Sequence, residues 1–482
     1  MNTAIITNRA TDHEPSIGSP NPTGPSFPIG SPKPPGEWSR IDAGRRCKIV
    51  GRAARGFARD VDRWVQRLCS EQRTDPVETI TAEILPLCAA LKFIARRGPK
   101  ILADRRLGGL GRPPWLLGVH QTVRRVPHGT VLILGTWNYP LFLVAAQTAA
   151  ALAAGNRVWI KPAIGCRELT LAMRDTFVDA GVPADAIEVL GESVEDATAA
   201  IDAPVQLVVL TGSAGTAAAV MRRCSDTLTP LIAEASGCDA MVCLPNFDVD
   251  LAAKLLRFGL SLNSGATCIA PRRVYVPFDH YDEFVAAVRR ELGDAPEMTV
   301  HPAARPATRS VIGSLAADRF LVGRPLDGDF ADHGRMQPTV VRIDDPDEPA
   351  ADCDVFAPIS GIHRYDAAAG LQSLAAAVNT SRYGLAASII GPRGDAVRLA
   401  DRLEVGTVVI NDLVVPTADP RVPFGGRRSS GFGVTRGREG LLAMTVPRVI
   451  ATRRHGPMTH LRDRTVSDRT MLTTLTRWLY GR

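Results

Sequence analysis

The chain contains 482 residues, which is too long for one compact core and suits two or three domains. Apolar residues make up 45% of it and charged residues 22%, an ordinary composition for a globular protein. The formal net charge is +7, yet the basic residues are scattered and do not alternate with aromatic side chains. This distribution does not favour a nucleic-acid-binding protein.

Cysteine and histidine usage restricts the kind of site that we expect. The nine cysteines are an odd number with no CxxC pair, which argues against a disulfide framework and favours a reducing compartment, the cytoplasm. The nine histidines show no HExxH or other metal-ligand spacing, so we expect no metal site. No apolar run approaches the ~18 residues of a membrane-spanning helix, and the N-terminus lacks the order of a signal peptide.

The N-terminal part of the chain changes character twice. Residues 1–36 are rich in Pro, Gly and Ser and cannot bury enough apolar surface to offset their ordering entropy, so we predict a disordered extension. Apolar residues at helical spacing predict helices between residues 53 and 97. The pattern becomes strand-like over 115–126 and ends at a Pro-His-Gly turn signal, which predicts a β-hairpin near 115–130.

From residue 131 onward, short apolar strands alternate with helices. The first set has strands at 131–134, 157–160 and 206–210 and helices at 142–154 and 167–179. The second set has strands at 240–244 and 272–276 and helices at 249–261 and 281–292. This alternation implies right-handed crossovers and mostly parallel sheets. We therefore predict two α/β lobes, with a ligand cleft at the strand C-termini or between the lobes.

Two segments of the first lobe follow strands at the edge where open sheets bind ligands. In GTWNYP (135–140), the Asn138 amide can donate a hydrogen bond to a developing oxyanion, although Asn also suits a plain turn. In TGSAGT (211–216), small residues lead into a helix start, where free backbone N–H groups suit phosphate oxygens. An ordinary tight turn is the alternative, because the segment matches neither a Walker A motif nor GxGxxG.

Two reactive side chains lie further along the chain. Glu234 stands in the small, apolar segment LIAEASG, where partial burial would raise its pKa and suit it to general-base catalysis. Alternatively, it is a charge at the edge of a helix or loop. Cys268 follows an amphipathic helix within NSGATCIAP, among residues too small to shield it, and an exposed thiol there can act as a nucleophile. The alternative is an inert, buried cysteine.

Taken in order, these segments resemble the aldehyde dehydrogenase superfamily. GTWNYP, ALAAGNRVWIKP, TGS, the Glu234 segment and NSGATCIAP keep the family's order, and Cys268 follows Glu234 at the family's interval of 34 residues. Later segments resemble its C-terminal landmarks, namely VFAP, NTSRYGLAASI, GTVVIND and PFGGRRSSGFG. The likeness covers roughly residues 60–450. The wording of GTWNYP and NSGATCIAP is closest to the class 3, or fatty-aldehyde, branch.

The resemblance implies an architecture and a reaction. It implies a dinucleotide-binding domain over 37–240, a catalytic domain over 241–411, and a segment 412–454 that returns to the first domain and adds an oligomerisation β-extension, with a homodimer favoured. It also implies that Cys268 attacks an aldehyde, that Asn138 and the Cys268 N–H hold the oxyanion, and that Glu234 activates the water that releases a carboxylic acid.

The resemblance further implies NAD or NADP as the hydride acceptor. Lys161 matches the family residue at the adenosine ribose, and Ser213, after Gly212, matches the residue at the pyrophosphate. Asp354 and Phe356 match the residues around the nicotinamide ribose and ring. Trp137 is assigned to the same cofactor site.

The chain departs from the family pattern at several positions. The family's ELGGK reads EASGC, which places Ser236 at a glycine and Cys238 at the lysine. The carboxylate of EIFGP is shorter by one methylene, as Asp354, while Ala218 replaces a glycine and Ile164 a glutamate. These changes leave two alternatives open. One is a degenerate nucleotide-binding relative without turnover, and the other is an acylating aldehyde dehydrogenase or acyl-thioester reductase.

Residues 455–482 continue beyond the likeness. Apolar side chains at helical spacing, with arginines nearby, suit weak peripheral contact with a membrane interface; they are Met471, Leu472, Leu475, Trp478 and Leu479. Together with the class 3 wording, this tail favours a long apolar aldehyde as substrate. The alternative is a helix that packs on its own protein or on a second subunit.

Overall fold

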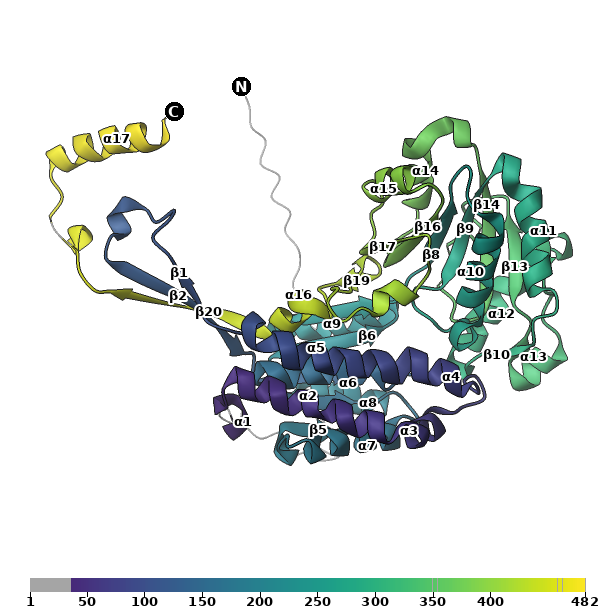
Figure 1. Cartoon of the computed structure of the whole chain (residues 1–482), viewed down its shortest axis with the longest axis horizontal. Coiled ribbons are helices and arrows are strands. Elements are labelled where there is room, and N and C mark those ends of the chain that lie inside the picture. The colour runs from purple at the N-terminus through teal and green to yellow at the C-terminus, as the bar shows by residue number, and fades with distance from the viewer. Residues whose placement is uncertain (1–35, 349, 353, 457, 462, 482) are drawn as a thin grey trace, which may run out of the picture.

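The computed structural model describes residues 36–348, 350–352, 354–456, 458–461 and 463–481. They form two α/β lobes and a β-arm that extends away from the first lobe (Figure 1). The extension predicted over residues 1–36 lies outside the described residues, apart from Gly36. In the described part of the chain, no helix has the length and apolar character needed to cross a bilayer.

The first lobe is built on a six-stranded sheet with the order β19-β7-β6-β3-β4-β5. Its strands are β3 (Thr130–Leu134), β4 (Arg157–Lys161), β5 (Ile187–Val189), β6 (Leu207–Gly212), β7 (Leu231–Ala235) and β19 (Gly431–Phe432). Neighbouring strands are parallel except for β19, which runs antiparallel to β7. The carboxyl ends of the parallel strands therefore meet at one edge, where open α/β sheets bind ligands.

Helices cover both faces of this sheet, because alternate side chains of its strands point to opposite sides. Val131 and Ile133 pack with α2, α5, α6 and α7, whereas Leu132 and Leu134 pack with α8 and α9. The helices of this lobe are α1 (Glu37–Arg40), α2 (Ala43–Arg59), α3 (Val61–Leu68), α4 (Pro76–Thr79), α5 (Leu85–Ile101), α6 (Phe142–Ala154), α7 (Arg167–Asp179), α8 (Val194–Asp202), α9 (Ala214–Thr227) and α16 (Gly437–Ala443). A π-helical turn over Ile80–Ile84 joins α4 to α5.

The second lobe is built on a seven-stranded sheet with the order β11-β13-β14-β9-β8-β16-β17. Its strands are β8 (Asp239–Cys243), β9 (Pro271–Pro277), β11 (Phe320–Val322), β13 (Thr339–Ile343), β14 (Ile359–Tyr365), β16 (Ala386–Ile390) and β17 (Thr407–Ile410). Among the described strands of this sheet, only β11 is antiparallel to its neighbour. β8 begins at Asp239, so the predicted boundary after residue 240 falls inside a strand.

Three hydrophobic cores hold helices against the second sheet, and one of them contains residues of the short helices in 305–313 and 328–333. α10 (Val249–Ser261) and α11 (Tyr281–Leu292) contribute to another core, and α14 (Gly370–Val378) and α15 (Arg393–Ala400) contribute to the third. The remaining short elements are α12 (Arg305–Gly313), α13 (Gly328–His333), and the strand pairs β10 (Met298–Thr299) with β12 (Arg335–Met336) and β15 (Tyr383–Gly384) with β18 (Arg427–Arg428).

The β-arm corrects the hairpin predicted near 115–130. The strand β2 (Val119–Pro127) is present, but it does not pair with β3 across the turn at Pro127. Its antiparallel partners are β1 (Arg105–Leu107) and β20 (Thr445–Arg453). Residues 114–116 form a 3-10 turn instead of strand. The arm thus joins segments from opposite ends of the chain, and Figure 1 shows it leading away from the first lobe toward α17 (Val466–Tyr480).

A buried ion pair fastens the N-terminal helices to the first lobe. Arg73, before α4, donates from Nη1 to Glu83 Oε1 at 2.6 Å, and both side chains are buried. The second oxygen of Glu83 accepts the Phe142 N–H at 2.6 Å, at the first residue of α6. Arg73 Nη2 donates to the backbone carbonyl of Asn138. This pair therefore holds both the start of α6 and the loop that precedes it.

We expect Glu83→Ala to destabilise the first lobe by about 3–5 kcal/mol, because it leaves the Arg73 guanidinium buried without its counter-charge. Urea unfolding followed by tryptophan fluorescence measures the effect. The double variant Arg73→Met with Glu83→Leu removes both charges and should recover most of the loss. Unchanged unfolding of Glu83→Ala would contradict this account.

Candidate active site

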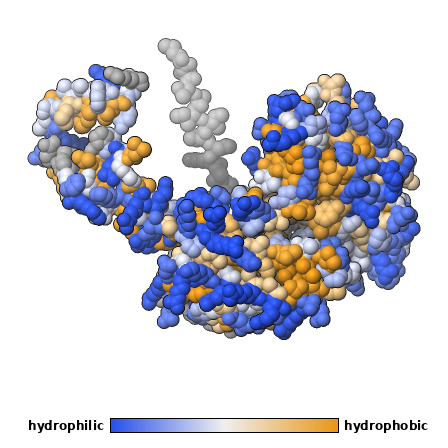
Figure 2. Space-filling view, viewed as in Figure 1, coloured by the Kyte–Doolittle hydropathy of each residue, from blue (hydrophilic) through white to orange (hydrophobic). Residues whose placement is uncertain are grey.

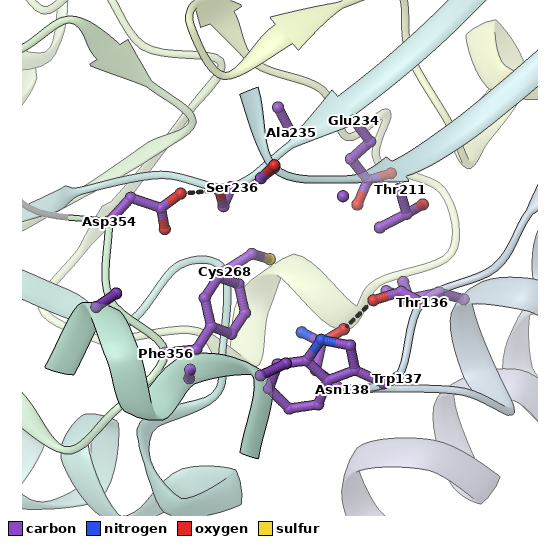
Figure 3. Close-up of a pocket in the computed structure, with 16 residues that line it drawn as sticks. Thr136, Trp137, Asn138, Thr211, Glu234, Ala235, Ser236, Cys268, Asp354 and Phe356 are labelled. Carbon is purple, nitrogen blue, oxygen red and sulfur yellow. Dashed lines mark hydrogen bonds between the residues drawn. The ribbon is translucent and has the colours of Figure 1, made fainter. Parts of the chain in front are cut away.

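A cavity of about 210 Å³ opens where the two lobes meet (Figure 3). Its walls come from the loops at the carboxyl ends of β3, β6 and β7 and from loops that precede β9 and β14 of the second lobe. The lining residues used below are Trp137, Asn138, Leu143, Gly212, Ser213, Glu234, Ser236, Cys268, Asp354 and Phe356. All of the site residues predicted from the sequence are among them except Lys161.

Lys161 ends β4 and lies outside the lining of this cavity. Its backbone carbonyl accepts the Gly135 N–H at 2.8 Å, which places it beside the Asn138 loop. Burial lowers the pKa of its ammonium group, and the nearby carboxylates of Asp196 and Glu192 oppose that shift. Lys161 therefore faces acidic side chains even though Ile164 stands where the family carries a glutamate.

The loop that carries Cys268 has an unusual backbone. Asn263, Ser264 and Gly265 adopt left-handed conformations in succession, with φ of 52°, 51° and 73°. A side chain at Gly265 would collide with the backbone of Ala357, so only glycine fits there. Arg272 donates from its two terminal nitrogens to the carbonyls of Gly265 and Ala357. The nucleophile loop is thereby tied to the segment that carries Phe356.

The Cys268 thiol is less accessible than its small sequence neighbours suggest. It is only partly exposed, and it packs against a cluster made of Ile269, Leu385, Ala386 and Phe424. Burial raises the pKa of the thiol well above its usual range, and the carboxylates of Glu234 and Asp239 raise it further. The expectation of an unshielded thiol is therefore wrong, because residues distant in the sequence cover it.

Asn138 is held in one orientation by bonds to its side chain and backbone. Its Oδ1 accepts from Thr136 Oγ1 at 2.7 Å, and its Nδ2 donates to the Ala266 carbonyl at 3.0 Å. Asn263 Nδ2 donates to the Asn138 backbone carbonyl at 2.8 Å. An amide nitrogen carries two hydrogens, and the bond to Ala266 uses one of them. The other is available to an oxygen that enters the cavity.

Glu234 is a strand residue, which corrects the expectation of a helix or loop edge. It lies in β7, between Thr211 of β6 and Gly431 of β19. Its Oε2 accepts from Thr435 Oγ1 at 2.7 Å. Burial raises the pKa of the carboxyl, whereas the Arg436 guanidinium and the Thr435 hydrogen bond oppose the shift. A buried carboxyl with a raised pKa suits a general base near neutral pH.

Asp354 and Ser236, two of the departures from the family pattern, contact each other. Ser236 Oγ donates to Asp354 Oδ2, as Figure 3 shows. The other oxygen, Oδ1, is buried and has no hydrogen-bond partner among the described residues. Burial raises the pKa of this carboxyl, and the Ser236 bond opposes the shift. A buried carboxylate oxygen without a partner, on a residue that lines a cavity, fits a ligand hydroxyl group, such as that of a ribose.

The remaining predicted residues form an aromatic wall and an anion-binding turn. Trp137 packs edge-on against Phe356, with ring centroids 5.7 Å apart. Ser213 caps the 14-residue helix α9, its hydroxyl accepting the Thr216 N–H at 3.1 Å. A helix start at the end of a parallel strand presents free N–H groups to phosphate oxygens.

Four residues around the site were not found from the sequence. His301 stacks on Trp137 with ring centroids 3.9 Å apart and comes from the second lobe. Thr435 and Arg436 follow the PFGGRRSSGFG segment by two and three residues, so proximity to that landmark was an available signal. Arg73 offered no local signal, because its partners are distant in the sequence.

Comparisons with known proteins agree with this arrangement. The model of the aldehyde dehydrogenase family matches residues 32–450. The succinate-semialdehyde dehydrogenase [NADP(+)] of Deinococcus radiodurans is 30% identical over 86% of this chain and 87% of its own length. The 4,4'-diapolycopene aldehyde oxidase of a Methylomonas species is 28% identical over 85% and 78%.

Solved structures of aldehyde dehydrogenases are also similar to this chain. The Mycobacterium tuberculosis aldehyde dehydrogenase complexed with NAD+ superposes with a TM-score of 0.78, at 25% identity, over 87% of this chain and 88% of that one. The relatives act on diverse aldehydes by name, so they support the family and not the class 3 branch in particular. The chain therefore belongs to the aldehyde dehydrogenase family, whose members are NAD(P)-dependent oxidoreductases that act on aldehydes.

Proposed function

We propose that this protein oxidises an aldehyde to a carboxylic acid through a covalent intermediate on Cys268. The observation that carries the proposal is the convergence of a thiol, a buried carboxyl and an oriented amide donor on one cavity, namely Cys268, Glu234 and Asn138. The reaction needs a nucleophile that can also leave, a base, and a donor for the developing oxyanion. These three side chains match those needs.

In the proposed reaction, the Cys268 thiolate forms a bond to the aldehyde carbon, and the oxygen becomes an alkoxide that accepts hydrogen bonds from Asn138 Nδ2 and the Cys268 N–H. The carbon then loses its hydrogen together with the bonding electron pair, which leaves a thioester on Cys268. Glu234 takes a proton from water as the water oxygen adds to the thioester. Cleavage of the C–S bond returns the thiolate and releases the acid.

The residues present fit a nicotinamide dinucleotide. The start of α9 at Gly212 and Ser213 suits its pyrophosphate, the unpartnered Oδ1 of Asp354 suits a ribose hydroxyl, and Lys161 suits the adenosine end. When bound, NAD or NADP supplies the acceptor for the hydride. The protein's own groups then have to orient the aldehyde and supply the proton transfers.

The substrate that we propose is a long apolar aldehyde. The thiol is packed among apolar side chains of Ile269, Leu385 and Phe424, with Val414 beside them. The class 3 wording of GTWNYP and NSGATCIAP supports the same substrate class. Relatives include enzymes named for a diapolycopene aldehyde and for β-apo-4'-carotenal. A panel of aldehydes from short aliphatic to long apolar chains tests this proposal with each cofactor.

We expect Cys268→Ala to abolish the formation of reduced cofactor and to leave cofactor binding nearly unchanged, because the thiol serves the chemistry and not the dinucleotide. Absorbance of NAD(P)H and titration calorimetry measure the two effects. Cys69→Ala, which removes an exposed thiol, is the matched control. Oxidation by Cys268→Ala at the wild-type rate would refute the covalent mechanism.

We expect Glu234→Gln to give a burst of reduced cofactor followed by slow turnover, since the thioester forms but water is not activated. Stopped-flow absorbance resolves the two phases. If turnover of the wild-type protein requires coenzyme A in place of water, the acylating alternative holds. If the cofactor binds but no aldehyde in the panel is oxidised, the chain is a non-catalytic relative.

We propose a homodimer joined through the β-arm. The arm stands clear of both lobes and exposes apolar side chains, among them Val446, Val449 and Ile450. We expect Val449→Asp to halve the mass in sedimentation velocity, because the charge would be buried in the interface. Val397→Asp, an exposed valine on α15, serves as the control and should leave the mass unchanged. A monomeric wild-type protein would contradict the proposal.

We further propose that the protein is cytoplasmic and that α17 makes weak contact with membranes. α17 has no buried residue, and Thr465 and Asp468 cap its start reciprocally. Leu472, Leu475 and Trp478 are exposed on it, and Figure 2 shows apolar side chains at this end of the molecule. An amphipathic helix with arginines suits an anionic interface.

We expect the full chain to co-sediment with phosphatidylserine vesicles at low salt more than the variant Leu475→Ser with Trp478→Ser. The variant Thr470→Ser with Thr473→Ser, on the same helix, should behave like the wild type. Equal amounts of all three proteins in the supernatant would show that α17 serves another purpose, such as contact with a second subunit.

A further inference from the structure

A buried arginine that the reaction above does not use lies beside the site. Arg436 lies between β19 and α16 and adopts a left-handed conformation, φ 61°, which is strained for a residue other than glycine. Its Cζ is 4.3 Å from the ring centroid of Phe424 and 5.7 Å from that of Phe142. Its Nη1 donates to the Thr417 carbonyl at 2.8 Å. The guanidinium is therefore fixed in place.

The surroundings of Arg436 connect it to both reactive groups. Phe424, which carries the guanidinium on its face, belongs to the cluster that packs against Cys268. Thr435, the preceding residue, donates to the Glu234 carboxylate. Arg436 Nε is buried without a hydrogen-bond partner among the described residues. The arginine thus makes fewer hydrogen bonds than a guanidinium can make. Because the group is buried, its positive charge interacts strongly with nearby ionisable groups.

Both acidic and basic side chains act on the pKa of the Cys268 thiol. Glu234 of β7 and Asp239 of β8 raise the pKa of Cys268, and the Tyr139 hydroxyl lies in the same neighbourhood. Arg436 acts in the opposite direction on both Cys268 and Glu234. An arginine keeps its charge inside proteins, so burial does not remove this effect.

We propose that Arg436 is a positioning residue whose charge stabilises the Cys268 thiolate before it attacks and the Glu234 carboxylate before hydrolysis. The thiol loses its proton to water in the cavity, and the electron pair stays on sulfur beside the guanidinium. The effect of Arg436 on turnover rests on the proposed covalent mechanism. The ionisation of the thiol, however, can be measured without any aldehyde.

The test is the pH dependence of Cys268 alkylation by iodoacetamide, followed by mass spectrometry of the peptide that contains Cys268. Arg436→Gln keeps a donor for the Thr417 carbonyl but removes the charge. Loss of the cation destabilises the thiolate, so the alkylation rate at a given pH should fall about tenfold, which corresponds to a rise of about one unit in the pKa of the thiol. Arg436→Lys should retain most of the wild-type rate.

Arg438→Gln is the matched control, because Arg438 is exposed and pairs only loosely with Glu439. Melting temperatures verify folding. If Arg436→Gln does not fold, Phe142→Leu, which removes the other ring beside the guanidinium, must shift the curve in the same direction. An unshifted curve in the folded variant overturns the role of Arg436 and leaves the proposed function intact. Failure of the proposed function shows separately, as aldehyde oxidation by Cys268→Ala.

Discussion

The backbone carbonyl of Asn138 is the point at which three parts of the chain are joined. Arg73, before the N-terminal helix α4, and Asn263, in the nucleophile loop, both donate to it. Glu83 fixes Arg73 and also accepts the Phe142 N–H at the start of α6. A carbonyl oxygen has two lone pairs and can accept both bonds. The amide donor of Asn138 is therefore placed by the N-terminal helices and by the nucleophile loop together.

Burial also determines the pKa values of the ionisable groups in the cavity beside Asn138. The cavity contains three acids, Cys268, Glu234 and Asp354, and burial raises the pKa of each. In a medium of low dielectric constant, one donor or one charge has a larger effect than it would in water. The two carboxyl groups accordingly each depend on a nearby hydroxyl: Glu234 on that of Thr435 and Asp354 on that of Ser236.

Local signals in the sequence predicted the elements that depend on local interactions. The helices at 142–154 and 167–179 have the predicted bounds, and the first ends at Gly155, whose φ of 99° glycine adopts without strain. The prediction failed where partners are distant. Strand β7 was missed, because a short run interrupted by Glu234 has no clear period. The pairing of the arm was predicted wrongly because β20 comes from the other end of the chain. The Cys268 thiol was predicted to be unshielded because the residues that cover it, Leu385 and Phe424, are distant in the sequence.

The departures from the family pattern look like losses when each is read alone, but two of them form one contact. Asp354 is a methylene shorter than the family's glutamate, and Ser236 adds a hydroxyl where the family has glycine. These residues lie far apart in the sequence, and the hydroxyl donates to the shortened carboxylate. That bond fixes Oδ2 and leaves Oδ1 buried without a partner among the described residues. A decayed site would leave both oxygens unsatisfied, at a cost of about 1–3 kcal/mol for each buried polar group. The paired change therefore argues for a carboxylate that still has a ligand to hold.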